Sequence, residues 1–542
     1  MYFEGFVRLT LAKGLILLGA VWFTHLGDTL QTIGTKARTL SGKSGFLRHI
    51  FWLLALCLTC SMASAQIPAK SGGSFVVRAG SKLTLEGQPF RYSGPNIEWL
   101  GLESYGPHDP IGPRYPSHFE VDDVFATADL MGAKVIRSQT MGDSVGCPLC
   151  IEPTLGKFNP DAFRSMDYAI QSAQAHHMKL IVTFVGDCAE CNGGGIGKYV
   201  EWAGAKNPND FFTDPKIIHA FEAHIDAVLN HVNSLTGVRY KDDPTIFAWE
   251  NCNMCGLVAL LTGQKDLAPV VQWVDTIGEH IKAIDAKHLY LDTSGLFRFD
   301  PSALDAKTPD LVAFEYYPHW DSLLGGNKTT TAQTFIDDAA AVTGHGKAYI
   351  INEFGWDITD WKTQKDLAHV LETFEKDPNI SGDDFWALQA HLPNFGWQPV
   401  PANTNNITMA LLGESGQWWA LYYTGIDTLT NSAEDMRARA QLLRAHAYRM
   451  VGAAVPPNPA PQPPVITMSG LQLGWRGSAG AVKYSIQRQA GGSQTWETVC
   501  DKCVTDTDSP WMDPTASFLS ASKYRVIGYN IDGVASAPSA PR

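Results

Sequence analysis

Two short apolar runs of this chain each end in a glutamate, a residue that can serve as an acid, a base or a nucleophile. They are Ile246-Phe-Ala-Trp-Glu250 and Ala348-Tyr-Ile-Ile-Asn-Glu353. Runs of this length and composition are typical of buried parallel strands. In a barrel of alternating strands and helices, the carboxyl ends of the strands form the face where chemistry takes place. We therefore expect both glutamates on that face.

The cysteines form a second pattern with chemical potential. All ten fall in C-x-x-C pairs, and three of the pairs follow the second, third and fourth candidate strands. In an exported protein such pairs form disulfides, either within or between pairs. The alternative is a tetrahedral Zn²⁺ site, which two pairs of thiolates can build. That metal site would draw on Cys147, Cys150, Cys188, Cys191, Cys252 and Cys255.

Strand-like runs alternate with amphipathic stretches between residues 75 and 450, which is the pattern of an α/β fold. Eight strands in about 300 residues favour a (β/α)₈ TIM barrel. A doubly wound sheet is the alternative, but no Gly-rich phosphate-binding motif follows the first strand. The expected strands are 90–99, 133–138, 180–187, 246–250, 289–294, 311–317, 348–354 and 384–390. The expected helices are 119–131, 161–177, 214–233, 270–284, 331–343, 364–376 and 433–450.

The chain divides into four parts at changes of composition. Residues 1–65 contain an upstream extension and then, over 44–65, a basic stretch, an apolar stretch and Ala63-Ser-Ala65, the pattern of a signal peptide. The alternative for this part is a membrane anchor. We expect the barrel over 66–452, a Pro-rich linker over 453–464 and a small all-β sandwich over 465–542.

The overall composition and charge of the chain limit the classes of molecule that it can bind. The 542 residues carry a formal net charge of −13 at pH 7, which argues against nucleic acid or an anionic membrane as a partner. The 16 Trp and 17 Tyr residues offer aromatic faces, a few of which we expect to stack on pyranose rings. We expect a secreted or periplasmic monomer with no cofactor and no stable membrane association after removal of the signal peptide.

A resemblance to a known family is carried by Leu235-Thr-Gly-Val-Arg-Tyr-Lys-Asp-Asp-Pro-Thr-Ile-Phe-Ala-Trp-Glu250. This stretch resembles the fourth-strand region of the endo-β-1,4-mannanases of glycoside hydrolase family 5. The resemblance covers most of 75–400 and includes Asp210-Phe-Phe-Thr-Asp-Pro215. In that family the strand is followed by Asn-Glu-Pro, whose Glu is the acid/base. Asn253 keeps the amide, but Met254 stands at the acid/base position, and a thioether cannot donate a proton.

The resemblance also implies roles for other strand ends. Glu353, in the motif Asn352-Glu-Phe-Gly355, matches the nucleophile, which would attack the anomeric carbon. Arg137 matches the arginine that would hold the nucleophile ionised, and Tyr317 matches the tyrosine that would hydrogen-bond to it. The implied sugar contacts are Asn96, Asn253, Trp99 as a platform and Trp386 as the floor of the −1 subsite.

Two further departures from the family bear on catalysis and selectivity. Glu315 stands where the family has a histidine close to the acid/base. It would take over proton donation if the charge of Glu353 raises its pKa, or it only replaces a hydrogen-bond partner. Gly186 and Asp187 replace paired asparagines after the third strand, so we expect Asp187 to alter the contacts at the −1 and −2 subsites.

The resulting prediction is a secreted retaining glycosidase that hydrolyses a β-linked polysaccharide, with mannan favoured by the resemblance. One alternative is a non-catalytic glycan-binding protein with a mannanase-like cleft. Another is a metal- or redox-active protein that uses the cysteine pairs. In the C-terminal part, Trp475, Tyr484 and Tyr524-Arg-Val526 resemble a fibronectin type III module, with a local disulfide between Cys500 and Cys503.

Overall fold

The computed structural model describes most of the chain from residue 73 onward. The described residues are 73–103, 113–186, 194–264, 266–295, 300–318, 321, 329–356, 364–398, 420–428, 431–516 and 522–542. The predicted signal peptide, Asp187, Cys188 and Cys191 lie outside them. Within the described ranges, no helix is both long and apolar enough to cross a membrane.

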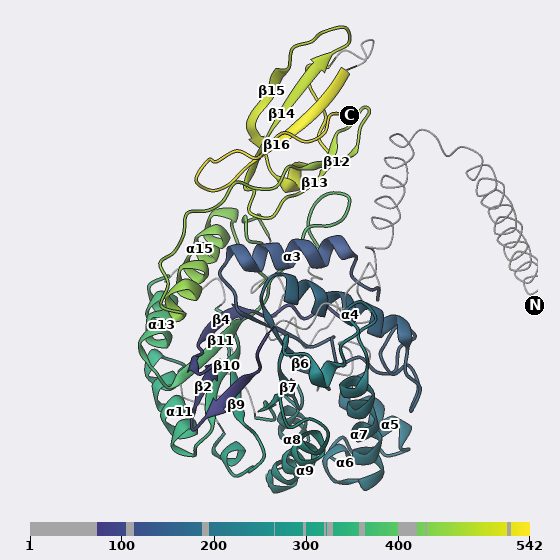
Figure 1. Cartoon of the computed structure of the whole chain (residues 1–542), viewed down its shortest axis with the longest axis vertical. Helices are drawn as coiled ribbons and strands as arrows, with labels where there is room; N and C mark the ends of the chain where they lie inside the picture. Colours follow the sequence, from purple (N-terminus) through teal and green to yellow (C-terminus); the bar gives the residue numbers. More distant parts are fainter. Residues whose placement is uncertain are drawn as a thin grey trace, which may run out of the picture. The chain divides into compact units, whose positions relative to one another are not determined.

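Eight parallel strands form the central sheet (Figure 1). They are β4 (Tyr92–Pro95), β5 (Val135–Ser138), β6 (Lys179–Thr183), β7 (Ile246–Glu250), β8 (Leu289–Asp292), β9 (Leu311–Tyr316), β10 (Ala348–Phe354) and β11 (Ile380–Phe385). Their order in space is β4-β11-β10-β9-β8-β7-β6-β5. The two ends of this order meet where Asn96 pairs with Arg137 and the Ile97 N–H donates to the Arg137 carbonyl oxygen at 2.9 Å. The sheet is therefore a nearly closed barrel, as the alternation of elements predicted.

Helices lie around the outside of these strands (Figure 1). They bury their apolar faces, as α9 does with Val270, Trp273 and Ile277. Polar caps set several helix starts, such as the capping box of Ser117 with Glu120. The helices are α3 (His118–Leu130), α4 (Pro160–Ala175), α5 (Gly195–Trp202), α6 (Asp210–Thr213), α7 (Pro215–Asn230), α8 (Gly256–Leu261), α9 (Ala268–Ile284), α11 (Ala332–Gly344), α13 (Gln364–Lys376) and α15 (Ala433–Met450).

An antiparallel meander precedes the barrel and was not predicted. It consists of β1 (Val76–Ala79), β2 (Lys82–Leu85) and β3 (Gln88–Pro89). Val76 and Leu83 are buried in one cluster with side chains of the barrel strands, including Phe247 near the start of β7. The meander thus covers apolar residues near the amino ends of the strands. The polar site residues lie at the opposite ends.

The eighth strand differs from the prediction, because β11 ends at Phe385 and does not extend over 384–390. Its sequence, Ile-Ser-Gly-Asp-Asp-Phe, has a polar centre that resembles a turn. In the structure the whole strand is buried, and Asp384 accepts a hydrogen bond from Tyr92 Oη at 3.0 Å. The local sequence therefore predicted the wrong bounds for this strand, because its polar side chains have partners from elsewhere in the fold. The first and third expected strands are likewise shorter than predicted.

The C-terminal residues form a small all-β unit, as predicted. Its strands are β12 (Val465–Met468), β13 (Gly474–Arg476), β14 (Lys483–Ala490), β15 (Glu497–Val504) and β16 (Ser522–Tyr529). They make a two-stranded sheet, β12-β13, and a three-stranded sheet, β15-β14-β16. Trp475 and Tyr484 pack in its core. The likeness to a fibronectin type III module stays a prediction.

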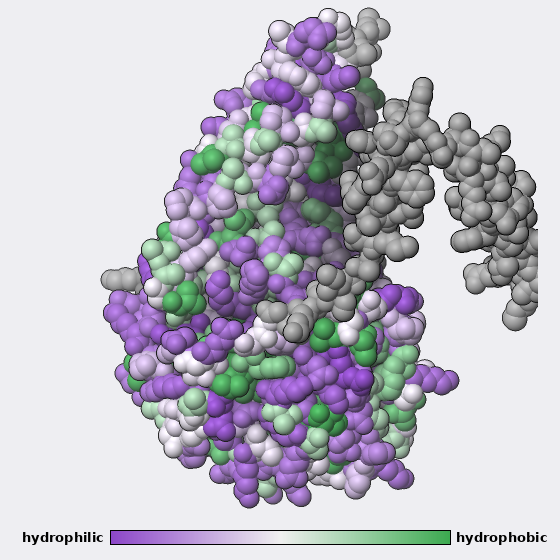
Figure 2. Space-filling model, in the orientation of Figure 1, coloured by the Kyte–Doolittle hydropathy of each residue, from purple (hydrophilic) through white to green (hydrophobic). Residues whose placement is uncertain are grey.

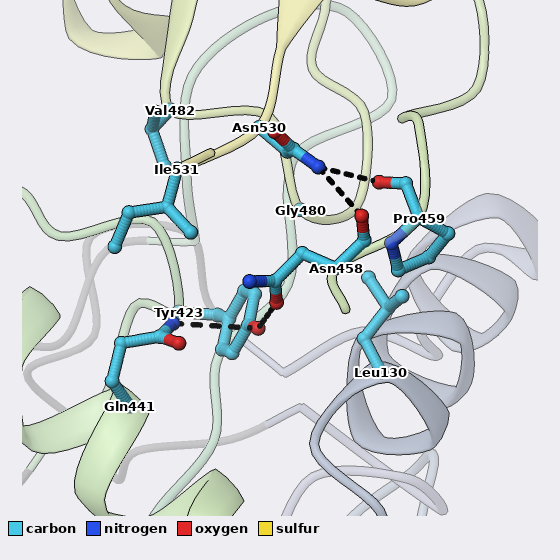
Figure 3. A pocket seen from close by; sticks show the side chains of 9 residues that line it. All are labelled: Leu130, Tyr423, Gln441, Asn458, Pro459, Gly480, Val482, Asn530 and Ile531. Carbon is cyan, nitrogen blue, oxygen red and sulfur yellow. Dashed lines mark hydrogen bonds between the residues drawn. The ribbon is translucent and has the colours of Figure 1, made fainter. Parts of the chain in front are cut away.

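The Pro-rich linker is held by hydrogen bonds on both sides (Figure 3). The Asn530 side-chain amide donates to the carbonyl oxygens of Asn458 and Pro459, at 2.9 Å each. Tyr423 Oη donates to Asn458 Oδ1 at 3.2 Å and accepts from Gln441 Nε2 at 3.5 Å. These residues surround a cavity of about 10 Å³, which is room for a single water molecule. The middle of the linker is thus anchored at Asn458 and Pro459, while most of its other residues are exposed.

A buried histidine joins the barrel to the C-terminal unit. His391 Nδ1 lies 2.9 Å from Asp123 Oδ2 of α3, and its Nε2 lies 3.2 Å from Asp506 Oδ2. Burial lowers the pKa of His391, but the charges of the two aspartates outweigh this effect and raise it to about 10. His391 is therefore an imidazolium at neutral pH, with one carboxylate from each unit.

The face of the molecule shown in Figure 2 is largely hydrophilic, and its apolar residues are scattered. The most exposed large apolar side chains include Leu471 and Met512, at 71% and 55% exposure, both in the C-terminal unit. Scattered apolar residues are ordinary on a protein surface and indicate no specific partner.

Candidate active site

Arg137, fully buried at the carboxyl end of β5, connects most of the candidate residues. Its Nε and Nη2 bind the two carboxylate oxygens of Glu250 at 2.8 and 2.6 Å. Its Nη1 donates to Glu353 Oε2 at 2.7 Å and to Asn96 Oδ1 at 3.0 Å. Its Nη2 also donates to Asn253 Oδ1 at 2.6 Å. One guanidinium thus gathers side chains from the ends of β4, β7 and β10.

Glu250 has the environment of a structural carboxylate. Besides its two bonds to Arg137, it accepts hydrogen bonds from Thr183 Oγ1 at 2.5 Å and from Thr293 Oγ1 at 2.7 Å. The side chain is fully buried. With four donors around it, Glu250 ties Arg137 to the end of β6 and to the segment that follows β8.

Glu353 lies at the end of β10 with 6% of its surface exposed. One of its oxygens faces Arg137, and the other accepts a short hydrogen bond from Tyr317 Oη. Burial raises the pKa of Glu353, while the Arg137 charge and the Tyr317 hydrogen bond act in the opposite direction. The two donors fix the orientation of the carboxylate.

Glu315 lies beside Glu353 on the neighbouring strand. The two residues are paired in the parallel register of β9 and β10. Paired residues on adjacent strands lie about 4.8 Å apart and point to the same face. Glu315 Oε1 is 3.9 Å from Arg137 Nη2, and the residue is 2% exposed. The register therefore places Glu315 and Glu353 next to each other at one end of the barrel, and Arg137 contacts both carboxylates.

The loop that carries Met254 is fixed at several points. A disulfide joins Cys252 to Cys255, and the Asn253 N–H donates to the Val185 carbonyl oxygen at 2.7 Å. Met254 has a left-handed backbone with φ of 51°, which is uncommon for a residue other than glycine. Its side chain is half-buried. The loop that carries Met254 is therefore tied down on both sides of this residue, and its correspondence to the family's acid/base position stays a prediction.

The cysteine prediction is confirmed for three pairs. Disulfides join Cys147 to Cys150, Cys252 to Cys255 and Cys500 to Cys503. The alternative of a thiolate metal site is wrong for four of its six proposed ligands, because a disulfide sulfur is not a thiolate. In the described part of the chain, no group of three or more His, Cys, Asp or Glu side chains is arranged to hold a metal ion.

The predicted sugar contacts differ in their surroundings. Asn96 is fully buried, and its Nδ2 donates to the Asn352 carbonyl oxygen at 3.0 Å, so it supports the site from beneath. The platform prediction does not hold for Trp99, whose ring packs in the core with 1% exposed. Trp386 follows β11 directly and its side chain is partly exposed. Its backbone N–H donates to the Phe354 carbonyl oxygen at 2.9 Å. Of the two tryptophans, only Trp386 has surface left for a sugar.

Sequence reasoning missed Gln139, Thr183 and Thr293. The two threonines bind Glu250, and the side-chain nitrogen of Gln139 lies 3.5 Å from Glu353 Oε2. Gln139 was within reach of the sequence, because side chains two residues apart in a strand point to the same face and Arg137 precedes it by two. No comparable sequence pattern indicates Thr183 or Thr293.

Comparisons with known proteins agree with this architecture. A family model described as "GH family 5 beta-mannosidase-like" matches residues 73–296. "Mannan endo-1,4-beta-mannosidase 7" of Arabidopsis thaliana is 31% identical over 248 residues, which are 45% of this chain and 54% of that protein. The chain therefore spans about half the length of this relative. An endo-beta-1,4-mannanase structure from Thermotoga petrophila has a TM-score of 0.51 and 19% identity, covering 83% of this chain and 97% of that one, a likeness of fold alone.

A more extensive match comes from "Mannan endo-1,4-beta-mannosidase 1" of Oryza sativa subsp. japonica. It is 30% identical over 359 residues, which are 58% of this chain and 79% of that protein. The segment matched by the family model contains Arg137, Asn253 and the unusual Met254. On this extent of similarity, the chain belongs to glycoside hydrolase family 5, in its mannanase-like group.

Proposed function

We propose that the protein is a secreted retaining glycoside hydrolase of the mannanase type, which cleaves a β-linked polysaccharide, with mannan as the favoured substrate. The main support is the environment of Glu353, a buried carboxylate oriented by Arg137 and Tyr317. A second carboxylate, Glu315, is its register partner on the next strand. The printed names of the relatives supply mannan as the favoured polymer.

In the first step, a Glu353 oxygen attacks the anomeric carbon of the sugar in the −1 subsite. The bond to the leaving sugar breaks, and its glycosidic oxygen takes the proton of Glu315. A covalent glycosyl-enzyme and an ionised Glu315 result. In the second step, Glu315 takes a proton from a water molecule, whose oxygen attacks the same carbon and releases Glu353. Glu315 thereby does the work of the family's missing acid/base.

Arg137 and Tyr317 act on the nucleophile in both steps. Their hydrogen bonds stabilise the carboxylate form of Glu353 against the effect of burial. They also hold it at one angle, which matters because attack requires a near-ideal approach to the anomeric carbon. Trp386, partly exposed after β11, is the proposed floor of the −1 subsite, and Asp187 and Asn253 are its proposed polar contacts.

A second candidate function is glycan binding without hydrolysis. The observation that favours it is Met254, because the residue at the family's proton-donor position cannot release a proton. In that case Glu353 and Trp386 contact the sugar, Arg137 orients Glu353, and no covalent intermediate forms.

An activity screen separates the two functions. The exported chain is incubated with mannan, with β-glucan and with an aryl β-mannoside, beside the variant Glu353→Gln and the control Glu434→Gln on the exposed start of α15. Turnover that disappears in Glu353→Gln and persists in the control supports the hydrolase. Glycan binding without turnover supports the second candidate. Absence of both binding and turnover contradicts both.

A further inference from the structure

We infer that Gln139 is a specificity-determining residue, whose side-chain oxygen accepts a hydrogen bond from a hydroxyl group of the sugar ring bound at Glu353. The inference rests on the proposed function, because it assigns a contact within the same site. Gln139 follows β5 and is 3% exposed. Its Nε2 lies 3.5 Å from Glu353 Oε2 and 3.4 Å from Asn96 Oδ1. The amide therefore contacts the proposed nucleophile directly.

The hydrogen-bond network fixes which end of this amide faces the nucleophile. Arg137 has only donors, so Asn96 must present its Oδ1 to it, at 3.0 Å. Asn96 Nδ2 then donates to the carbonyl oxygens of Asn352 and Asp384, at 3.0 and 3.1 Å. Gln139 thus faces two acceptors, Asn96 Oδ1 and a Glu353 oxygen. The NH₂ group must point to them, and the carbonyl oxygen of the amide points away.

That carbonyl oxygen is the atom that a sugar would satisfy. Gln139 Oε1 is buried and has no hydrogen-bond partner among the described residues. Buried acceptors in native proteins nearly always have a partner, and one without a partner needs an explanation. The oxygen belongs to the same amide group whose nitrogen touches Glu353. On the inference drawn here, a hydroxyl group of the ring bound at Glu353 supplies the missing donor.

The segment that carries Gln139 is rigid, which suits a selective contact. The Gln139 carbonyl oxygen accepts from the Asp143 N–H at 2.9 Å, closing a turn. The neighbouring Thr140 N–H donates to the Glu98 carbonyl oxygen at 3.0 Å, and its Oγ1 accepts from the Gly101 N–H at 3.0 Å. These bonds tie the segment to the chain that follows β4. A pre-organised acceptor discriminates between ligands because it cannot move to meet a different one.

The test combines one substitution with a panel of sugars. Gln139→Met removes both ends of the amide at similar volume. Gln398→Met is the matched control, because Gln398 is equally buried but pairs with Glu103 and the Ala390 N–H. The kcat/KM, or the Kd where turnover is absent, is measured for an aryl β-mannoside and each of its monodeoxy analogues. Thermal unfolding checks that each variant is folded.

We expect Gln139→Met to weaken the parent sugar about 2- to 10-fold, the usual effect of losing one neutral hydrogen bond. For one monodeoxy sugar, which lacks the donating hydroxyl, the wild-type chain and Gln139→Met should be equal. Equal losses for every sugar, or no loss relative to Gln398→Met, would overturn the inference and leave the proposed function intact. A wild-type chain that neither binds nor cleaves any of these sugars would overturn both.

Gln139→Glu serves if the methionine variant does not fold. It keeps an acceptor of the same shape, so it should retain the wild-type preference for the parent sugar over that one monodeoxy analogue, whatever its absolute rate. A Glu variant that treats the two sugars alike contradicts the inference.

Discussion

Replacement of Glu315 by glutamine tests whether proton donation has moved from position 254 to β9. Glutamine keeps the size and the hydrogen-bonding shape of Glu315 but has no proton to transfer. The proposal depends on two observations, the pairing of Glu315 with Glu353 and the 3.9 Å contact of Glu315 with Arg137. They bring two carboxylates from adjacent strands to one guanidinium, and a retaining mechanism requires two neighbouring carboxyl groups.

The expected size of the effect depends on the leaving group. A sugar leaving group needs a proton, so Glu315→Gln should lower kcat/KM on a mannooligosaccharide by about 10²- to 10⁴-fold. A dinitrophenolate leaves without protonation, so kcat/KM on the dinitrophenyl glycoside should change only a few-fold. Its kcat should fall, because water attacks the glycosyl-enzyme without a general base. Azide needs no base, so it should restore kcat and yield a glycosyl azide.

The assay uses both substrates with and without azide, and Glu103→Gln is the control because Glu103 is also a buried glutamate. Unchanged activity of Glu315→Gln on the oligosaccharide would refute the reasoning. Equal losses on both substrates would also contradict it, because they indicate damage to folding or to the nucleophile. A gain of oligosaccharide activity in the variant Met254→Glu would show that the family's original position still suits a donor.

Three further predictions follow from buried charges. Burial raises the pKa of Glu353 above its ordinary value of 4.5, and the nucleophile must be ionised to attack. We therefore expect kcat/KM on an aryl glycoside to fall with decreasing pH, with a midpoint above pH 4.5. A kcat/KM that stays constant down to pH 4.5 would contradict the raised pKa. Burial and the charge of Glu120 raise the pKa of Glu103 to about 8. Folding stability should therefore decrease as pH rises from 4.5 to 8, because the folded state must release a proton that the unfolded chain has already lost. If the melting temperature of Glu103→Gln decreases with pH as steeply as that of the wild-type chain, Glu103 is not the cause. His391→Asn leaves Asp123 and Asp506 without their cation and should cost about 3–5 kcal/mol in urea unfolding. A decrease of less than about 1 kcal/mol in the free energy of unfolding would mean that His391 does not form ion pairs with the two aspartates.

Local sequence was sufficient for the elements with strong apolar runs. The predicted strands 246–250 and 348–354 coincide with β7 and β10, because both are buried along their whole length. It was insufficient for β11, whose two central aspartates each accept a hydrogen bond from, or contact, a residue far away in the chain. The strands of the meander, with two to four residues each, are too short for periodicity to be detected.

The site residues divide in the same way. Arg137 and Glu353 lie at the ends of apolar strands and match a family motif, which is why the sequence indicated them. Their side chains are in contact at 2.7 Å, and their catalytic roles stay predictions. The pairing of Glu315 with Glu353 depends on the register between two strands, which no local pattern specifies. The burial of Trp99 depends on the packing of distant segments, and a motif match to a sugar platform says nothing about that packing.

The balance of charge around Arg137 is the physical basis of the proposal that Glu315 donates the proton. Three carboxylates, those of Glu250, Glu315 and Glu353, surround one guanidinium in a buried space. Neighbouring buried carboxylates disfavour each other's ionisation, and the proposed mechanism uses this effect to keep one proton on the pair of Glu315 and Glu353. Glu353 accepts a hydrogen bond of 2.7 Å from Arg137 and a second hydrogen bond from the Tyr317 hydroxyl. The contact between Arg137 and Glu315 is longer, at 3.9 Å. Donors stabilise the ionised form of a carboxylate. In the proposed mechanism these two donors keep Glu353 available for attack, and the Glu315→Gln assay tests whether Glu315 supplies the proton.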